Sequence, residues 1–474
     1  MSSPDAPPVD ARDARIAELE VQLRQRDARV AALEGQVAAL QEQVAAAQRA
    51  AKRQATPFAR RKRNPHPQKP GRKPGQGHFA SRPQPTAEQV TETKEAPLLT
   101  CPDCGHAVAA DQCHEQFQID IPPVHPVVTR FVTHSGGCPG CAKRVHSAHP
   151  EQISRAHGAA GVVFGPRLKA LAADLHHRFG ASYGKIVELF RDAFGLATTR
   201  GALSQADTRL AAQAKPVYQQ LVELIRGSVV VHVDETGWRI GCLSAWLWVF
   251  ANRQITVYTI AARRGHEVII DILGRQFRGV LVADCFKAYD AAALAEWLQQ
   301  KCVAHLLRNL RELEEQKTGG AVRFARAVMA VLRAALALKA SAPDIRSPAY
   351  EAATEELEAR LDQLIDGRRQ FRDPDNARMA ARLRFQREHL LRFLYWAEVD
   401  ATNNLAERQL RPNVVTRKTG GCNRTADGAD AHAILGSILA TCRQQAVGIL
   451  DYLIKLQQFG GTPPSLVPAD VAPP

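Results

Sequence analysis

Long apolar segments are missing from this sequence of 474 residues. No stretch approaches the roughly 18 consecutive apolar residues that read as a membrane-crossing helix, and the opening Met-Ser-Ser-Pro-Asp-Ala-Pro-Pro has no apolar core of a secretion signal. We therefore expect a cytoplasmic protein. The hydrophobic content of 45% excludes a disordered chain, and the length is enough for roughly two to four domains.

Acidic residues are absent between Glu42 and Glu88, where basic residues alternate with prolines. Proline interrupts helices and like charges repel, so this segment should be an extended arm that orders on a phosphate backbone. A solubilising linker is the alternative. The net charge of +14 favours nucleic acid as the partner. The residues expected to contact DNA here are Arg60, Arg61, Lys62, Arg63, Lys69, Arg72 and Lys73.

Cysteines number only ten, and without a secretion signal they are expected to be reduced thiols. Four of them form two Cys-x-x-Cys pairs, separated by strand-like runs at 117–121 and 127–132. Four thiolates form the closed shell of a structural zinc ion, so the pattern predicts a zinc ribbon. His106, Cys113 and His114 are rival ligands nearby. The predicted zinc ligands are Cys101, Cys104, Cys138 and Cys141.

A heptad repeat occupies the N-terminal segment. Position a holds Ile16, Leu23, Val30, Val37 and Val44, and position d holds Leu19, Arg26, Leu33, Leu40 and Ala47. β-Branched residues at a with leucine at d favour a parallel two-stranded coiled coil. A single amphipathic helix packed on its own chain is the alternative, but the narrow apolar stripe suits a helical partner better.

Residues 165–214 have helical periodicity with recognisable ends. Pro166 suits a first turn, Ser182 an N-cap and Gly195 a C-terminal stop, and Thr198–Ser204 opens another helix. Three short helices with a tight turn resemble a helix-turn-helix, although any helical connector would give a similar pattern.

Two aspartates follow short β-branched runs. Asp234 ends the run from Ser228, and Asp284 ends the run from Gly279. Such runs are typical of buried strands, and a carboxylate at the end of one is costly unless it is paired or holds a cation. A helix N-cap or turn is the ordinary alternative for each aspartate alone. Together they indicate a Mg²⁺ site for phosphoryl transfer.

More strand-like runs surround these aspartates. Residues 246–251 and 256–260 predict a meander with the strand of Asp234, and a helix at 291–298 and a strand at 301–304 are expected after Asp284. This is the element order of an α/β ribonuclease H-like core. A helical region at about 311–395 follows, and it predicts an insertion in that core.

A third acidic residue, Glu407, follows the insertion in a predicted helix, 123 residues after Asp284. Amides and guanidinium groups surround it at helical spacing, which suits a metal ligand beside groups that hold phosphates. A solvated, salt-bridged helix face is the alternative. Pro412 is expected to end or kink this helix. The basic residues expected to contact DNA here are Arg408, Arg411, Arg417 and Lys418.

The order of these segments resembles the insertion sequence 66 family of bacterial transposases. The likeness covers nearly the whole chain and is most specific in Cys302-x-Ala-His305-x-x-Arg308 and in Asn404-x-x-Glu407-Arg408-x-x-Arg411-Pro412. It implies a ribonuclease H-like domain with a DDE catalytic triad that binds Mg²⁺ or Mn²⁺. The implied catalytic and metal-binding residues are Asp234, Asp284 and Glu407.

Some positions depart from the family pattern. Cys and Phe follow Asp284, where the family usually has Gly and an aromatic residue. In related transposases a Tyr and an Arg precede the Glu on its helix, whereas here Asp400 and Asn403 do. The role of holding phosphates is therefore expected to pass to Arg408 and Arg411. Base stacking by Tyr289 and Trp238 is less expected than a place in the core.

The expected function is a DNA transposase that binds the terminal inverted repeats of its element and cleaves and joins strands. A non-catalytic DNA-binding protein and a nuclease without joining activity are the alternatives. Expected partners are a second copy of the chain and accessory proteins of the same element, with the cytoplasmic protein bound to the nucleoid DNA. The expected segments are a coiled coil (1–50), basic arm (51–98), zinc ribbon (99–150), helical segment (151–220), catalytic domain (221–450) and C-terminal tail (451–474).

Deleting residues 52–78 should lower the salt dependence of DNA binding, because the arm would no longer release counterions from phosphates. The slope of log affinity against log salt should fall by about 0.9 for each phosphate that the arm no longer neutralises. Binding isotherms at several salt concentrations measure it, and an unchanged slope would rule out contact between this arm and DNA.

Overall fold

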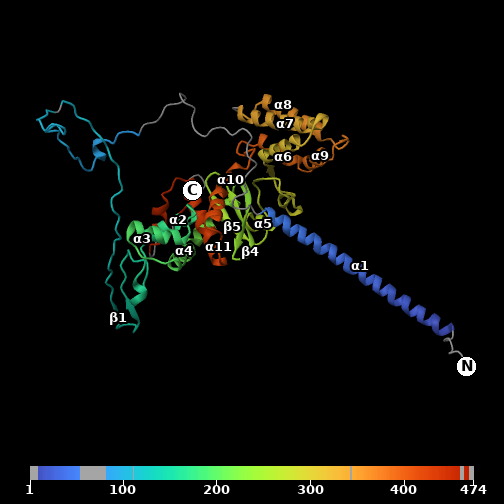
Figure 1. Ribbon diagram of the computed structural model, residues 1–474, viewed down its shortest axis with the longest axis horizontal. Coiled ribbons are helices and arrows are strands. Elements are labelled where there is room, and N and C mark those ends of the chain that lie inside the picture. The colour runs from blue at the N-terminus through green and yellow to red at the C-terminus, as the bar shows by residue number, and fades with distance from the viewer. Residues whose placement is uncertain (1–8, 54–81, 110, 342–343, 459–463, 469–474) are drawn as a thin grey trace. The chain divides into compact units, whose positions relative to one another are not determined.

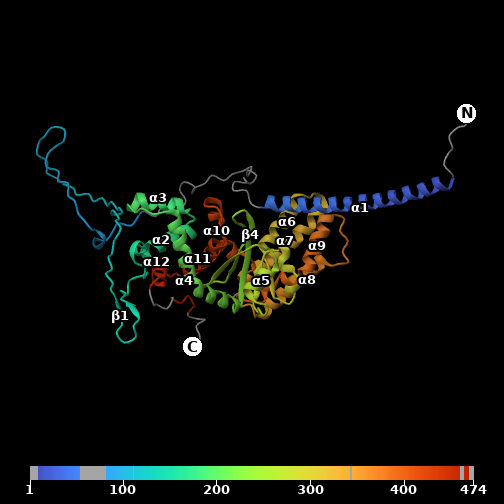
Figure 2. The ribbon, with the colours of Figure 1, turned by 90° about the horizontal axis from the view of Figure 1, so that it is seen from below.

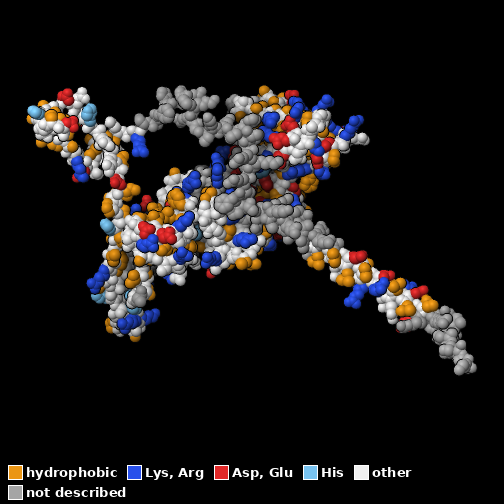
Figure 3. Space-filling model, in the orientation of Figure 1, with side chains coloured by type: hydrophobic (Ala, Val, Ile, Leu, Met, Phe, Trp, Pro, Cys, Tyr) orange, Lys and Arg blue, Asp and Glu red, His pale blue; other side chains and the backbone are white. Residues whose placement is uncertain are grey.

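The computed structural model describes residues 9–53, 82–109, 111–341, 344–458 and 464–468. The chain divides into two units, 1–122 and 123–474. In the first unit, α1 (Val9–Arg53) confirms the predicted N-terminal helix (Figures 1 and 2). Apolar, basic and acidic side chains all appear along its described part (Figure 3). Among the described residues, no helix is both long and apolar enough to cross a membrane.

The predicted strands at 117–121 and 127–132 do not form. Ile119 is 82% exposed and Val127 is 91% exposed, so neither run has a surface to pack on. β-Branched residues favour strands mainly through cross-strand packing, and that packing is missing here. A short hairpin of β1 (Ser135–Gly137) and β2 (Arg144–His146) flanks the second cysteine pair instead.

Three helices follow in the second unit: α2 (Pro166–His177), α3 (Tyr183–Phe194) and α4 (Arg200–Arg226). The predicted ends of the first two are confirmed, because α2 begins at Pro166, the Ser182 hydroxyl caps α3, and Gly195 ends α3 with a φ of +64°. The third helix is longer than expected, with 27 residues. It packs against the central sheet and shares that core with α2.

The sheet has the strand order β5-β4-β3-β6-β7. Pairing is antiparallel between β3 and β4 and between β4 and β5, whereas β6 and β7 continue the sheet parallel to β3. The predicted meander is therefore confirmed, and α5 (His266–Leu273) connects it to β6. The strand bounds are β3 (Val230–Ile240), β4 (Leu243–Ala251), β5 (Thr256–Ala261), β6 (Val280–Ala283) and β7 (Gln299–Lys301).

The segment after β6 differs from its prediction. Residues 291–298 contain a single 3₁₀ turn, Ala292–Leu294, and β7 comes earlier than the expected strand at 301–304. The Gln299 side chain donates hydrogen bonds to the Tyr289 carbonyl at 2.9 Å and to the Leu294 carbonyl at 3.4 Å, and of these two only Leu294 lies within the expected helix. Tertiary contacts thus replace the local helical pattern.

Helices fill the predicted insertion: α6 (Val303–Glu315), α7 (Val322–Ser341), α8 (Pro348–Ile365) and α9 (Pro374–Phe385). They surround a second apolar core that includes Val280 and Val282 of β6 (Figure 1). The last helices are α10 (Asn404–Thr419), α11 (Ala426–Gln444) and α12 (Ile449–Leu456). α10 continues through Pro412 to Thr419, so Pro412 does not end the helix, and the alternative of a kink stays a prediction.

Different helices pack on the two faces of the sheet. Val231 and Val233 of β3 belong to the core shared with α4 and α11. α10 packs on β3 and β4, with Ala406 and Leu410 in a core that includes Leu247. Because side chains alternate along a strand, the even-numbered residues of β3 face the side of α10.

Replacing Lys301 with alanine should lower the free energy of unfolding by up to about 3–5 kcal/mol, because it removes the buried cation that faces the partly buried Asp290 carboxylate. The Lys301 side chain is fully buried and its Nζ lies 2.7 Å from Asp290 Oδ1. Urea unfolding followed by tryptophan fluorescence measures the change. The exposed Lys455→Ala is the control, and equal losses in the two variants would contradict the buried pair.

Candidate active site

Asp234 and Asp284 lie on neighbouring parallel strands. β3 and β6 are paired in the register of His232 with Val282. Two residues further along both strands, the same register places Asp234 opposite Asp284. Both aspartates then lie on the face of the sheet that α10 covers. Asp234 accepts a hydrogen bond from the next backbone N–H at 2.9 Å, and Asp284 accepts one from its following loop at 2.8 Å.

The strand-end prediction holds for only one of the two aspartates. Asp284 directly follows β6, but Asp234 lies within β3, which continues to Ile240. Pairing with β4 extends along β3 as far as Ile240 and keeps it extended beyond the aspartate.

Asn403 brings Glu407 to this end of the sheet. Its buried amide donates to the Val233 carbonyl at 2.8 Å, and its oxygen lies 3.2 Å from His232 Nδ1. Val233 directly precedes Asp234, and the Glu407 N–H donates to the Asn403 carbonyl at 3.2 Å. The first turn of α10 is thereby attached beside Asp234.

Asp400 strengthens the same attachment. His232 Nε2 lies 3.4 Å from Asp400 Oδ2, and a hydrogen bond from His232 lowers the pKa of Asp400. Asp400 and Asn403 occupy the positions where a Tyr and an Arg were expected. In this chain they brace α10 against β3.

The three carboxylates influence one another. Burial raises the pKa of Asp234 well above its usual range, and the charges of Glu235, Asp284 and Glu407 raise it further. Such a cluster is costly unless a cation neutralises it. Carboxylate oxygens from separate elements are donors that suit Mg²⁺ or Mn²⁺, so the residues fit a hard divalent cation.

Two further residues meet Glu407. Donor atoms of Cys302, His305 and Glu407 all lie within 4.8 Å of one another. His305 Nδ1 is buried, has no hydrogen-bond partner and lies 3.7 Å from Glu407 Oε1. Burial raises the pKa of the Cys302 thiol, and a neutral thiol is a poor ligand for a hard cation. His305 is therefore the better placed of the two to act on Glu407.

A buried group on the opposite face secures the Asp284 loop. Glu235 accepts hydrogen bonds from Tyr289 Oη at 2.8 Å and from Arg264 at 2.7 and 3.0 Å. Arg264 also lies 4.0 Å above the Phe286 ring. Burial raises the pKa of Glu235, while Tyr289 and Arg264 act to lower it. Sequence reasoning missed this group because nothing in the local pattern links Arg264 to Glu235.

Both aromatic residues considered for base stacking lie in the core. Tyr289 is fully buried, and Trp238 donates a hydrogen bond from its indole to Asn423 at 2.8 Å. The core alternative is confirmed for both.

The basic residues predicted on α10 have different surroundings. Arg408, Arg411 and Lys418 are exposed. Arg417 donates to the Thr236 hydroxyl at 2.9 Å, and burial lowers its pKa. At least part of its guanidinium is used within the protein. The basic residues of the arm, from Arg60 to Lys73, lie outside the described residues.

Each Cys-x-x-Cys pair forms a tight turn. The Gly105 N–H donates to the Cys101 carbonyl and the Ala142 N–H to the Cys138 carbonyl, both at 2.9 Å. Backbone N–H groups of Cys104 and Cys141 lower the pKa of the Cys101 and Cys138 thiols. Each turn therefore favours thiolates. The two turns fall in different units, so the four-thiolate zinc shell stays a prediction.

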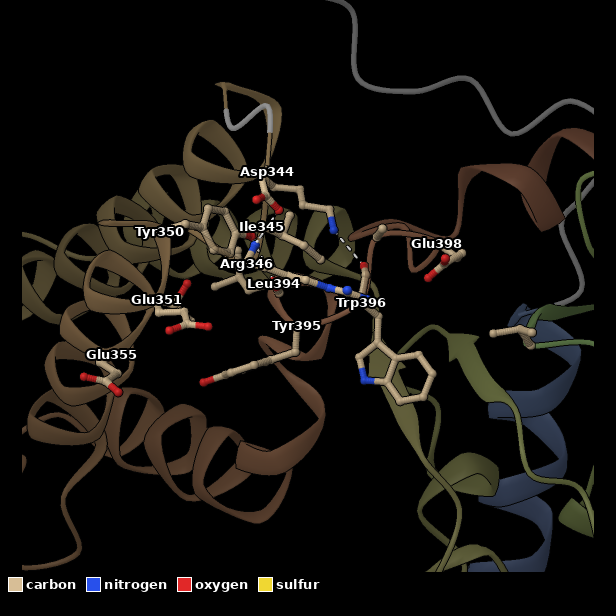
Figure 4. Close-up of a pocket in the computed structure, with 14 residues that line it drawn as sticks. Asp344, Ile345, Arg346, Tyr350, Glu351, Glu355, Leu394, Tyr395, Trp396 and Glu398 are labelled. Atoms are coloured by element: carbon tan, nitrogen blue, oxygen red, sulfur yellow. Dashed lines mark hydrogen bonds between the residues drawn. The ribbon is translucent and has the colours of Figure 1, made fainter. Parts of the chain in front are cut away.

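A cavity of about 1000 Å³ lies beside the insertion, and none of Asp234, Asp284 and Glu407 lines it. Its lining includes more carboxylates than cations, which does not suit DNA phosphates. Figure 4 shows Tyr395 extending toward the acidic side chains of α8. The acidic residues of the lining are Asp344, Glu351, Glu355 and Glu398.

Comparisons with known proteins agree with the motifs. The family model described as "Transposase IS66 family" matches residues 161–431, more than half of the chain. An uncharacterized protein of Sinorhizobium fredii (strain NBRC 101917 / NGR234), y4qI, is 24% identical over 288 residues. The match covers 55% of this chain and 53% of that protein. The chain therefore spans about half the length of this relative.

Replacing Asp234 with asparagine should raise the melting temperature of the metal-free protein at neutral pH. With its raised pKa, Asp234 keeps a proton in the folded protein that the unfolded chain releases. The free energy of unfolding therefore decreases as the pH rises from the usual carboxyl pKa to the raised pKa of Asp234. The decrease is about 1.4 kcal/mol per pH unit in that range. Asp234→Asn has no group that titrates there, so its stability does not show this decrease.

Melting curves from pH 5 to 8 with a chelator measure this difference. The exposed Asp271→Asn is the matched control. If Asp234→Asn and Asp271→Asn follow the same pH dependence, Asp234 carries no raised pKa.

Proposed function

The chain belongs to the IS66 family of transposases, and on that basis we propose that it binds the terminal inverted repeats of an insertion sequence and cleaves and joins DNA strands. The observation that carries the proposal is the convergence of Asp234, Asp284 and Glu407, from β3, the end of β6 and α10, at one place on the sheet.

The sheet supports a ribonuclease H-like catalytic domain at 221–450. An antiparallel meander joined to two strands parallel to its first strand is the arrangement expected of that fold. The helices between β7 and α10 suit the proposed insertion at 311–395.

Asp234, Asp284 and Glu407 would together hold Mg²⁺ or Mn²⁺. When bound, such ions would supply positive charge to the attacking and leaving oxygens of an in-line displacement at phosphorus. Asn403 and His232 hold Glu407 near Asp234. His305 Nδ1, which lies 3.7 Å from Glu407 Oε1 and has no hydrogen-bond partner, would orient the Glu407 carboxylate. Water would be the first nucleophile and the freed 3′-hydroxyl the second.

Arg408 and Arg411 would hold the DNA backbone near the carboxylates. Both are exposed and follow Glu407 on α10. Guanidinium groups bind phosphate oxygens in pairs. The basic arm and Lys418 would add sequence-independent affinity, and the cysteine pairs would stabilise their segment with zinc.

α1 would join two copies of the chain as a coiled coil. Its described a and d residues, such as Ile16 and Leu33, are about half exposed. A parallel partner would bury them. Accessory proteins of the same element are proposed as further partners.

The double substitution Leu19→Glu with Leu33→Glu should convert a dimer to a monomer, because it places charges in the seam. Gln25→Glu with Ala32→Glu adds the same charges at c positions and should leave the dimer intact. Sedimentation equilibrium measures both, and a monomeric wild type would contradict the coiled coil.

Strand cleavage and joining on labelled element-end DNA with Mg²⁺ or Mn²⁺ tests the catalytic proposal. The comparison uses the wild type, Asp284→Ala, Glu407→Ala and the exposed control Asp271→Ala. We expect the first two substitutions to lower activity by at least about 100-fold, since each removes an ionic ligand, while DNA affinity is retained. The control should match the wild type.

The products separate the alternatives. Ends joined to target DNA indicate a transposase, and cleavage without joining indicates a nuclease. Binding without cleavage, even after accessory proteins are added, would indicate a non-catalytic DNA-binding protein. Full activity of Asp284→Ala or Glu407→Ala would show that the site lies elsewhere.

A further inference from the structure

A chain of buried polar side chains connects α2 and α4 to α10. Its members, called here the buried polar chain, are His177, Asp207, His432 and Asn413, each at least nine-tenths buried. His177 Nε2 lies 3.0 Å from Asp207 Oδ2, and His177 Nδ1 lies 3.1 Å from His432 Nδ1. His432 Nε2 lies 2.7 Å from Asn413 Oδ1.

The contact with Tyr258 determines how the Asn413 side-chain amide is oriented. Its hydroxyl donates to the Gln409 carbonyl at 2.6 Å. Burial raises the pKa of Tyr258, and a hydrogen bond with the Asn413 side chain opposes that rise, as a donor to the phenol oxygen does. The Asn413 amide nitrogen therefore faces Tyr258, and its oxygen faces His432.

His177 links Asp207 to His432 through its two ring nitrogens. His432 Nε2 meets Asn413 and its Nδ1 meets His177, and burial lowers the pKa of His432 well below its usual range. The Asp207 carboxylate meets His177 Nε2 and also accepts from Tyr183 at 2.6 Å. Burial acts to raise the pKa of Asp207, but the contacts with His177 and Tyr183 bring it below its usual value. His177 and Asp207 therefore form a buried, hydrogen-bonded pair.

A metal ion does not explain this cluster. Donor atoms of His176, His177 and Asp207 lie within 4.8 Å of one another. Both His177 nitrogens are already engaged, and His176 Nδ1 lies 2.8 Å from the Ala181 carbonyl. The hydrogen bonds of His177 and Tyr183 already satisfy the Asp207 carboxylate.

The attachment at Asn413 lies at a weak point of α10. Asn413 follows Pro412, which has no N–H to donate to the preceding turn. The helix is therefore easier to bend there. Asn403 anchors the start of α10 and Asn413 anchors it after the proline, with Glu407 between them.

We propose that the buried polar chain is a positioning device that fixes the rotation of α10 and so holds Glu407 beside Asp234. The buried His177–Asp207 pair anchors it in α2 and α4, and His432 passes the constraint to Asn413. The inference rests on the catalytic role proposed for Glu407. The four members are positioning residues, because they act on α10 through Asn413 and do not contact the reacting groups.

Cleavage kinetics of His432 variants in the full chain test this role. His432→Leu removes both hydrogen bonds, whereas the amide of His432→Gln can donate to Asn413 and accept from His177. Thr441→Val is the matched control, because Thr441 is equally buried on α11 and bonds to β5. Each protein is assayed on labelled element-end DNA at saturating Mn²⁺, with DNA affinity and melting temperature measured in parallel.

We expect His432→Leu to lower kcat at least tenfold with DNA affinity unchanged, and His432→Gln to recover activity to within threefold of the wild type. Thr441→Val should lose stability but keep its kcat. If His432→Leu and Thr441→Val keep the same kcat, the positioning role is wrong while the proposed function stands. A wild type that stays inactive after accessory proteins are added would overturn the proposed function and the positioning role with it.

Discussion

The burial of Asp234 beside other carboxylates is the constraint that the supports around the site must overcome. Burial and neighbouring charge raise the pKa of Asp234, so the cluster opposes its own formation. The fold must therefore hold each carboxylate through contacts elsewhere. β-Sheet pairing supplies two of these positions, because β3 and β6 fix the register of the aspartates.

The third position needs more support, since Glu407 arrives on a helix 123 residues after Asp284. Asn403 attaches that helix to β3 through one hydrogen bond to the Val233 carbonyl. On the opposite face, Glu235 secures the loop behind Asp284 through Tyr289. Hydrogen bonds to backbone carbonyls and buried carboxylates are rigid supports, because breaking one leaves a polar group unsatisfied. Pre-organisation of this kind would lower the reorganisation needed when charge changes during the proposed phosphoryl transfer.

Structural features that depend on residues close together in the sequence could be predicted from it. The runs that form β3, β4, β5 and β6, the cap at Ser182 and the stop at Gly195 depend on neighbouring residues, and all of these formed, whereas the runs at 117–121 and 127–132 did not. The helix expected at 291–298 is replaced by a 3₁₀ turn, where Gln299, outside the expected helix, donates to the Leu294 carbonyl. Contacts between distant residues, such as His177 with His432, could not be inferred, because a single sequence carries no signal for them. The family motifs singled out the carboxylates, but not the residues that brace them.

A crystal structure of the full chain with Mn²⁺, using the anomalous signal of manganese, would show whether Asp234, Asp284 and Glu407 form one site for a divalent cation. We expect a manganese peak within about 2.0–2.3 Å of oxygens of Asp234 and Asp284, as hard-cation coordination requires. Glu407 should lie in the same shell or directly beside it. Manganese bound elsewhere at full occupancy, with these carboxylates empty, would show that the three residues do not form the cation site.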